Sequence, residues 1–226
     1  MTTTVYPIPL GHTNCFLLKG DGAVLIDAGP PKTVGKFVKL IRQTPVKPED
    51  IGLIVITHGH FDHIGSVRDI KAMTGAKLAI HKIEKPWVEQ ALINMPPGAS
   101  TWGRVLSKLG GAIVPKMVKF PPTTVDITLG DDDFSLAEFG INGMVVATPG
   151  HSYGSMSVIL DSGEAFVGDM AMNGPPLRMG PGLPAFAEDL PRLRESWRKV
   201  LGLGIKTVYP SHGKPFPAEV MRQSAA

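Results

Sequence analysis

The stretch Thr57-His58-Gly59-His60-Phe61-Asp62-His63 places four side chains that can bind a metal within six positions, directly after the apolar run Leu53-Ile54-Val55-Ile56. Three of the seven histidines of the chain lie in this stretch, a concentration that chance or a merely polar surface loop explains poorly. Imidazole nitrogens and carboxylate oxygens are common protein ligands of zinc and similar cations. The stretch therefore predicts a metal site at the end of a strand that is buried on both faces.

Three further donors follow expected strands in the same way. They are His151 after the strand expected at 143–148, Asp169 after 165–168 and His212 after 205–209. Glycine lies beside these donors and permits tight backbone geometry and the close approach of a ligand, at Gly59, Gly150, Gly168 and Gly213. Five histidines and two aspartates exceed the roughly four ligands of one tetrahedral zinc ion. They suit two ions, with a carboxylate as the bridging oxygen ligand.

Size and charge indicate an ordinary globular protein rather than a nucleic-acid-binding one. The 226 residues are 43% hydrophobic and 19% charged, and their length predicts a single domain over 1–226. The net charge is +3, and the lysines and arginines are scattered instead of forming a basic patch. This distribution argues against nucleic acid as a partner. A sequence pI of about 9.0 allows a mild attraction to anionic substrates.

Compartment and membrane signals are also informative. The single cysteine, Cys15, excludes an intramolecular disulfide, so nothing requires an oxidising compartment. No signal-peptide pattern opens the sequence, and no window approaches the roughly 18 to 20 apolar residues of a membrane span. We therefore expect a cytoplasmic protein with no membrane partner. The sequence leaves the oligomeric state open, with a homodimer as one alternative.

The remaining pattern predicts strands, helices and one irregular segment. Strands are expected at 15–19, 23–27, 53–56, 77–80 and 205–209, and in a mostly antiparallel meander at 125–129, 134–139, 143–148, 155–160 and 165–168. Helices are expected at 32–42, 64–73, 101–109 and 189–201, the last capped by Asp189. The segment 86–122 lacks one period and is interpreted as an insertion or lid, the alternative being an irregular connection packed on the core.

The motifs together resemble the metallo-β-lactamase-fold hydrolases, and within them the branch that includes glyoxalase II-like thioesterases. They occur in the order of that family between residues 25 and 213. The motifs are Leu25-Ile26-Asp27-Ala28-Gly29, Thr57 to Gly65, Thr148-Pro149-Gly150-His151-Ser152-Tyr153-Gly154-Ser155, Val167-Gly168-Asp169 and Ser211-His212-Gly213. The resemblance implies an α/β fold, an αββα sandwich of two mixed β-sheets with helices on the outer faces.

The resemblance also implies a role for each matching residue. His58, His60 and His151 would bind one metal, Asp62, His63 and His212 would bind the other, Asp169 would bridge them, and Asp27 would orient the site. The implied cofactors are two divalent metal ions, with zinc favoured and iron or manganese as alternatives.

Two differences between this sequence and members of the family indicate which branch it resembles. Asp169 argues against a dedicated β-lactamase, and the sequence ends soon after His212, so the helical extension that binds glutathione in longer glyoxalase II enzymes is expected to be absent.

These features predict a binuclear metal-dependent hydrolase of the glyoxalase II, lactonase or esterase type. A metal-bridging hydroxide would attack a thioester, lactone, carboxylic ester or phosphoester of a small, fairly hydrophobic substrate, with Asp62 and Asp169 as the catalytic carboxylates. Residues expected near the substrate are Tyr153, Asn173 and an apolar group in 86–122 and at Met170, Met172, Pro175, Pro176, Leu177 and Met179. The alternatives are a mononuclear iron sulfur dioxygenase of the persulfide dioxygenase type and a non-catalytic, metal-stabilised binding protein.

Overall fold

The strand that precedes the histidine-rich stretch is β4, Ile51–Val55, and its apolar run is buried on both faces, as predicted. Leu53 and Val55 face one hydrophobic core, whereas Ile54 between them faces another. The computed structural model of the protein describes residues 2–93, 95–175 and 177–225. In this structure β4 lies inside a sheet, with a parallel neighbour on each side.

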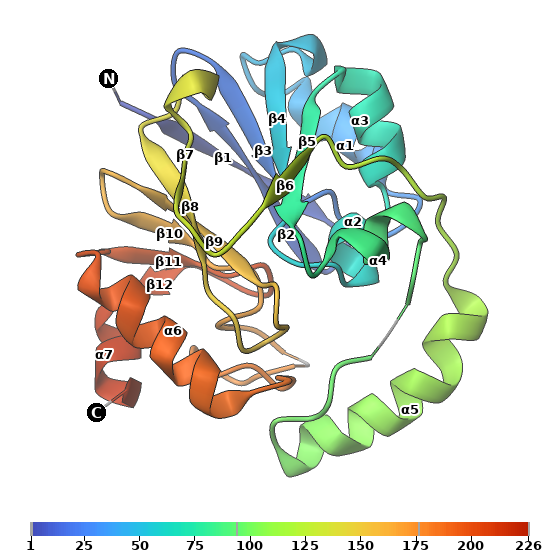
Figure 1. Cartoon of the computed structure of the whole chain (residues 1–226), viewed down its shortest axis with the longest axis vertical. Helices are drawn as coiled ribbons and strands as arrows, with labels where there is room; N and C mark the ends of the chain where they lie inside the picture. Colours follow the sequence, from blue (N-terminus) through green and yellow to red (C-terminus); the bar gives the residue numbers. More distant parts are fainter. Residues whose placement is uncertain (1, 94, 176, 226) are drawn as a thin grey trace.

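The first sheet has the spatial order β1-β2-β3-β4-β5-β6 (Figure 1). Its other strands are β1 (Thr4–Leu10), β2 (Thr13–Lys19), β3 (Ala23–Ile26), β5 (Lys77–His81) and β6 (Ile127–Leu129). The pairs β1–β2 and β2–β3 are antiparallel, and the remaining pairs are parallel, so the sheet is mixed. The parallel half brings the carboxyl ends of β3 and β4 to the same edge, which is where the first motifs lie.

The second sheet has the spatial order β12-β11-β10-β9-β8-β7. Its strands are β7 (Phe134–Ser135), β8 (Gly143–Ala147), β9 (Met156–Leu160), β10 (Glu164–Phe166), β11 (Thr207–Tyr209) and β12 (Phe216–Pro217). The strands β7 to β10 form an antiparallel meander, and β11 pairs in parallel with β10. Two mixed sheets therefore face each other, as predicted.

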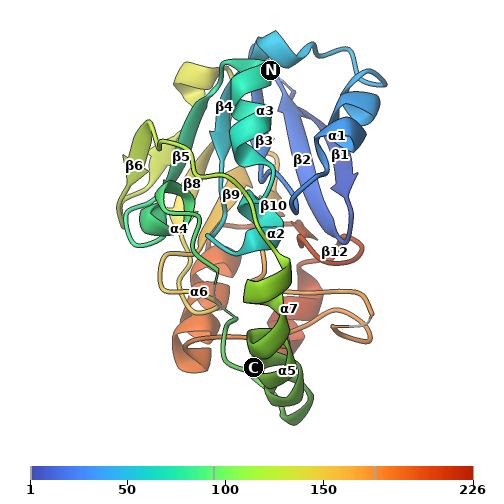
Figure 2. The same cartoon turned by 90° about the vertical axis from the view of Figure 1, so that its right-hand side faces the viewer.

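Helices cover the outer face of each sheet and complete four layers (Figures 1 and 2). The helices of the structure are α1 (Val34–Ile41), α2 (Phe61–Ile64), α3 (Val67–Thr74), α4 (Lys85–Glu89), α5 (Thr101–Met117), α6 (Leu190–Gly202) and α7 (Glu219–Ala225), with short 3-10 helices at Pro48–Asp50 and Ala137–Phe139, and α5 lies outside the four layers. Separate apolar cores fill the space between α1 and α3 and the first sheet, between the two sheets, and between the second sheet and α6 and α7. This is the αββα sandwich that the resemblance implied.

The most regular helix of the sequence is confirmed in detail. The Asp189 side chain accepts a hydrogen bond from the Arg192 N–H at 3.0 Å and so caps α6. Leu193, Trp197 and Val200 are buried against the second sheet. The spacing of these apolar residues follows the helical period, and it predicted which face of the helix is covered.

Several predicted elements differ from the structure. The strand expected at 125–129 is β6, which pairs in parallel with β5 in the first sheet and does not join the meander. The strand expected at 134–139 ends at Ser135, because the chain then turns through a 3-10 helix to Gly140 at a φ of +70°. The helix expected at 64–73 is α3, which spans Val67–Thr74, and the short α2 (Phe61–Ile64) precedes it. The helix expected at 101–109 continues to Met117.

One strand that was not predicted from the sequence is β1. The strand β1 contains Pro7 and Pro9, which conceal its β character in the sequence. It lies at the edge of the sheet, where a strand tolerates proline because one side of it has no partner. No bilayer-spanning helix occurs in the part of the chain that the structure describes. The single-domain organisation and the role of 86–122 as a lid stay predictions.

Candidate metal site

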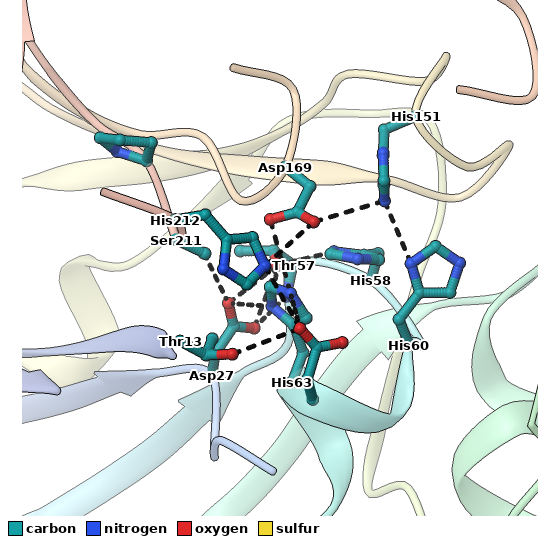
Figure 3. Close-up of polar contacts among 12 residues, drawn as sticks. Thr13, Asp27, Thr57, His58, His60, His63, His151, Asp169, Ser211 and His212 are labelled. Carbon is teal, nitrogen blue, oxygen red and sulfur yellow. Dashed lines mark hydrogen bonds and ion pairs between the residues drawn. The ribbon is translucent and has the colours of Figure 1, made fainter. Parts of the chain in front are cut away.

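Loops at one edge of the sandwich bring the predicted donors together (Figure 3). His58 and His60 lie between β4 and α2, and Asp62 and His63 lie within α2. The other donors follow strands of the second sheet: His151 after β8, Asp169 after β10 and His212 after β11. All seven residues are buried, although each is polar or charged. Burial of so many imidazoles and carboxylates without a ligand would be unfavourable.

Asp27 connects the loops at the base of the site. It follows β3, and its carboxylate accepts hydrogen bonds from the Thr57 N–H at 2.8 Å and from the Thr57 hydroxyl at 2.9 and 3.0 Å. It also accepts from His63 Nδ1 at 2.8 Å and from the Ser211 hydroxyl at 3.3 Å. A single buried carboxylate thus fixes both the first histidine loop and the loop that carries His212, as the predicted orienting role requires.

The histidine rings are held so that one nitrogen of each faces the centre of the site. His151 Nδ1 donates to the Phe186 carbonyl at 2.9 Å, and His212 Nδ1 donates to the His12 carbonyl at 3.0 Å. His63 Nδ1 donates to Asp27, and His58 Nδ1 lies 3.1 Å from the Thr57 hydroxyl. A proton held on Nδ1 leaves Nε2 with a free lone pair, which is the form of imidazole that binds a metal.

The inward-facing atoms form two separate groups, and a third group, His58, His63 and Asp169, joins them. One ligand atom from each of His58, His60 and His151 lies within 4.8 Å of the others, and the same holds for Asp62, His63 and His212. Figure 3 shows the Asp169 carboxylate between His151 and His212. Its oxygens lie 3.5 Å from His63 Nε2, 3.7 Å from His151 Nε2 and 3.3 Å from His212 Nε2. Asp169 is therefore placed to contact ions in both groups.

The donor set fits metal ions by its chemistry. His58 Nε2, His63 Nε2 and Asp169 Oδ1 are buried without a hydrogen-bond partner. His151 Nε2 and His60 Nδ1 face each other at 3.0 Å, close to the roughly 3.4 Å between two nitrogens on one tetrahedral zinc. Buried polar atoms normally have partners, so unpartnered donors of this kind fit the coordination of an ion.

Without a metal, the histidines of the two groups differ in their pKa values. Burial lowers the pKa of His60 to about 3, and it also lowers the pKa of His58 and of His151. Burial opposes the charged form of His63 too, but Asp27, Asp62 and Asp169 outweigh it and raise the pKa of His63 to about 9. The pKa of His212 is raised against burial in the same way, chiefly by Asp169. His63 and His212 therefore hold protons in the absence of a metal, and metal binding would displace them.

The pKa values of the Asp62 and Asp169 carboxyl groups are lowered. Burial disfavours the ionised forms of Asp62 and Asp169, but the neighbouring His63 and His212 outweigh it and hold the pKa of each carboxyl below its ordinary value. Both aspartates are therefore ionised at neutral pH, which is the state that binds a cation.

A cavity of about 360 Å³ opens over the donor atoms. Its apolar wall includes Met95, Leu106, Met172, Pro175, Leu177 and Phe186. Of the residues expected in an apolar pocket, Met172, Pro175, Leu177 and Met95 of the segment 86–122 line the cavity, whereas Met170 and Met179 are not among its lining residues. Pro176, which was part of that prediction, lies outside the described residues.

His12 is a site residue that the sequence left unassigned. It lies in the turn between β1 and β2, lines the cavity, and has a side chain that is 60% exposed. Its ring stacks on His212 with centroids 5.6 Å apart, and its Nε2 lies 3.3 Å from Asp62 Oδ2. The sequence signal was weak, because a lone histidine in a hairpin turn gives no indication of which loop faces it.

The proposed substrate contacts Tyr153 and Asn173 stay predictions. The Tyr153 side chain is 50% exposed, and its N–H donates to Glu188 at 2.9 Å. Asn173 donates through its side chain to the Lys214 carbonyl at 2.8 Å, beside the loop of His212. Neither residue is among those that line the cavity.

The comparisons with known proteins agree with this geometry. The sequence model of the Metallo-beta-lactamase superfamily matches residues 8–212, a range that contains every donor described above. The chain belongs to the metallo-beta-lactamase superfamily. Its fold and its buried His and Asp clusters are those of a metal-dependent hydrolase family, and divalent metal binding follows from that membership.

Relatives within the superfamily are distant. The chain is 30% identical over 215 residues to the probable metallo-hydrolase YflN of Bacillus subtilis, covering 88% of this chain and 78% of that one. It is 28% identical over 208 residues to the beta-lactamase-like protein 2 homolog of Drosophila melanogaster, covering 90% of this chain but only 59% of the relative. The archaeal superfamily protein ST1585 of Sulfolobus tokodaii shares the fold with a TM-score of 0.71, at 22% identity, over 100% of this chain and 86% of that chain.

Glu84 is a second residue that sequence reasoning missed in this superfamily site. Its buried carboxylate accepts a hydrogen bond from the Gly59 N–H at 2.9 Å and another from the Gly154 N–H at 3.0 Å. Gly59 separates His58 from His60, and Gly154 follows His151 in the next loop. Glu84 therefore holds together the two loops that supply the first group of donors.

We expect Glu84→Gln to loosen this connection. The amide would present an N–H group to one of the two backbone donors, which costs about 1–3 kcal/mol at a buried position. Metal affinity should fall by roughly 10- to 100-fold, as is usual when a residue that orients ligands is changed. Thermal unfolding with and without metal, and a metal titration, measure the two effects. Glu138→Gln, at an exposed position, is the matched control and should change neither quantity.

Proposed function

We propose that this protein is a binuclear metal-dependent hydrolase that cleaves an ester-like bond in a small, fairly hydrophobic substrate. One observation supports the proposal: Asp169 lies within 3.3–3.7 Å of histidines from two groups of buried donors, beside an apolar cavity of about 360 Å³. Zinc is the favoured metal, because histidine-rich sets with one or two carboxylates suit it well. Thioesters, lactones, carboxylic esters and phosphoesters are the candidate substrates.

The residues of the chain supply the setting for this chemistry. Bound in the site, two divalent ions would lower the pKa of water and polarise the oxygen of the scissile group. Asp62 and Asp169 supply negative charge that offsets the charge of the ions. Met172, Leu177 and Phe186 form an apolar wall that would position the hydrophobic part of a substrate and exclude bulk water.

A panel of chromogenic thioesters, lactones, carboxylic esters and phosphotriesters tests the proposal, run together with elemental analysis. We expect near two zinc, iron or manganese ions per chain, and hydrolysis of at least one class that a chelator abolishes and added metal restores. One iron per chain with oxygen consumption would instead support the sulfur dioxygenase. Full metal loading with no turnover of any class would support a metal-stabilised binding protein.

A further inference from the structure

The helix α5 presents an apolar stripe that the described part of the protein leaves uncovered. The exposed residues of this stripe, with their exposed fractions, are Trp102 (55%), Val105 (45%), Leu109 (57%), Ile113 (51%) and Met117 (78%). They recur at intervals of three or four residues, so they share one face over the length of the helix. Isolated exposed apolar residues are ordinary, but a continuous stripe of this kind indicates an interaction surface.

The helix is held only lightly by the rest of the fold. Gly103 is its one buried residue, and α5 lies outside the sandwich in Figure 1. Its sequence is also a poor helix former, since Gly110, Gly111 and Pro115 lie in its second half. A helix with weak propensity and few tertiary contacts is normally stabilised by packing of its apolar face. An apolar environment in contact with the exposed stripe would provide this packing and stabilise the helix.

The charges around the stripe all have one sign. Between residues 90 and 125 the sequence has no Asp or Glu, and its charged residues are Arg104, Lys108, Lys116 and Lys119. All of them are exposed. The lysines that form ion pairs with carboxylates in the described residues lie elsewhere, at Lys71, Lys82, Lys85 and Lys199. An exposed apolar stripe flanked only by cations is complementary to an anionic, apolar surface.

We propose that α5 binds the surface of an anionic phospholipid bilayer, with its apolar stripe in the interfacial region and its cations at the headgroups. A second copy of the chain fits less well. A twofold contact through this stripe would bring one set of cations against the other, which opposes association. The proposal revises the sequence-based expectation of no membrane partner, and it concerns contact with the membrane surface only.

The place of α5 in the fold connects this surface to the cavity. Leu106 of α5 lines the cavity together with Met95 and Pro96, which precede the helix. A bilayer contact at the stripe would therefore lie beside one wall of the site. If the proposed hydrolase function holds, an apolar ester dissolved in the membrane could reach the donors past this wall. Vesicle binding itself requires no turnover, so the two proposals can fail separately.

Co-sedimentation of the full-length protein with vesicles tests the proposal. We expect binding to phosphatidylcholine vesicles that contain about a third phosphatidylglycerol to exceed binding to pure phosphatidylcholine at least ~10-fold, and to weaken at high salt. Trp102 should move into a less polar setting on binding, so the tryptophan emission should shift to the blue. Trp102→Phe should lose this shift, because Trp197 is buried at 1% exposure and Trp87 is already packed, partly buried, against the first core.

Paired variants separate the stripe from the rest of the molecule. Leu109→Glu with Ile113→Glu should lower vesicle binding at least ~10-fold without loss of helix content, because both side chains are already exposed. Lys108→Glu with Lys116→Glu tests the charges alone and should lower binding to anionic vesicles. Leu203→Glu, which changes an apolar residue that is 40% exposed after α6, should have no effect. Equal binding by wild type and the Leu109/Ile113 variant, or a dimer in solution that this variant dissociates, would overturn the proposal.

Discussion

Asp169→Asn is expected to lower kcat/KM by at least ~10³-fold, which corresponds to about 4 kcal/mol of transition-state stabilisation. The reason is geometric. Asp169 is placed between the two groups of donors, with oxygens 3.5 Å from His63 Nε2 and 3.7 Å from His151 Nε2. An amide keeps the shape of the side chain, but it removes the negative charge and offers one oxygen where the carboxylate offers two. We expect the loss of at least one metal ion per chain.

Two measurements check this expectation. Elemental analysis of the purified variant gives its metal content, and kinetics on the best substrate of the panel give kcat/KM with and without added metal. Asp132→Asn, at an exposed position far from the donors in sequence, is the matched control and should retain both. A variant that keeps two ions and turns over within ~10-fold of the wild-type rate would show that Asp169 does not bridge the ions.

The sequence predicted the fold where burial follows a simple period. The unbroken apolar run before Thr57 predicted β4, and the helical spacing of Leu193, Trp197 and Val200 predicted α6. The prediction from sequence failed where a strand's place in the sheets depends on a partner far away in the sequence. The short β6 has no distinctive local pattern of its own, and it joins the first sheet only because β5 offers a free parallel edge.

The candidate site divides in the same way. Donors that follow strands within recognisable motifs could be identified, because their residue types and spacing carry the chemistry. His12 and Glu84 could not, because each acts through a contact that only the folded chain creates. Glu84 meets Gly154 across 70 residues of sequence, and His12 contributes its carbonyl to His212 across 200. Nothing near either residue in the sequence indicates that partner.

Asp27→Asn is expected to have a large effect on stability. Without metal, it should lower the free energy of unfolding more at pH 6 than at pH 9. Asp27 raises the pKa of His63, which lies near 9 in the folded protein against an ordinary value of 6.5. A raised pKa stabilises the folded state fully below pH 6.5, and this contribution is lost as the pH rises towards 9. The whole shift is worth about 3 kcal/mol, and Asp27 is one of three carboxylates that produce it.

The choice of asparagine separates this charge effect from strain. Asp27 has a φ of +60°, a left-handed conformation that asparagine tolerates and that alanine does not favour. Asparagine also retains one oxygen for the Thr57 N–H, which donates to Asp27 at 2.8 Å. Asp27→Ala removes every acceptor from the buried Thr57, His63 and Ser211 donors, so it should destabilise the protein at both pH values, by roughly 3–5 kcal/mol.

Urea denaturation of the chelated protein at pH 6 and pH 9 measures both effects by linear extrapolation. For Asp27→Asn the loss in free energy of unfolding should shrink as the pH rises, because His63 then loses its proton in the wild type too. For Asp27→Ala the loss should remain large at pH 9, since the unpaired donors persist. A loss for Asp27→Asn that is equal at the two pH values would mean that Asp27 holds the loops by hydrogen bonding alone. In that case the charge of His63 would owe its stabilisation to Asp62 and Asp169, and the orienting role of Asp27 would be purely geometric.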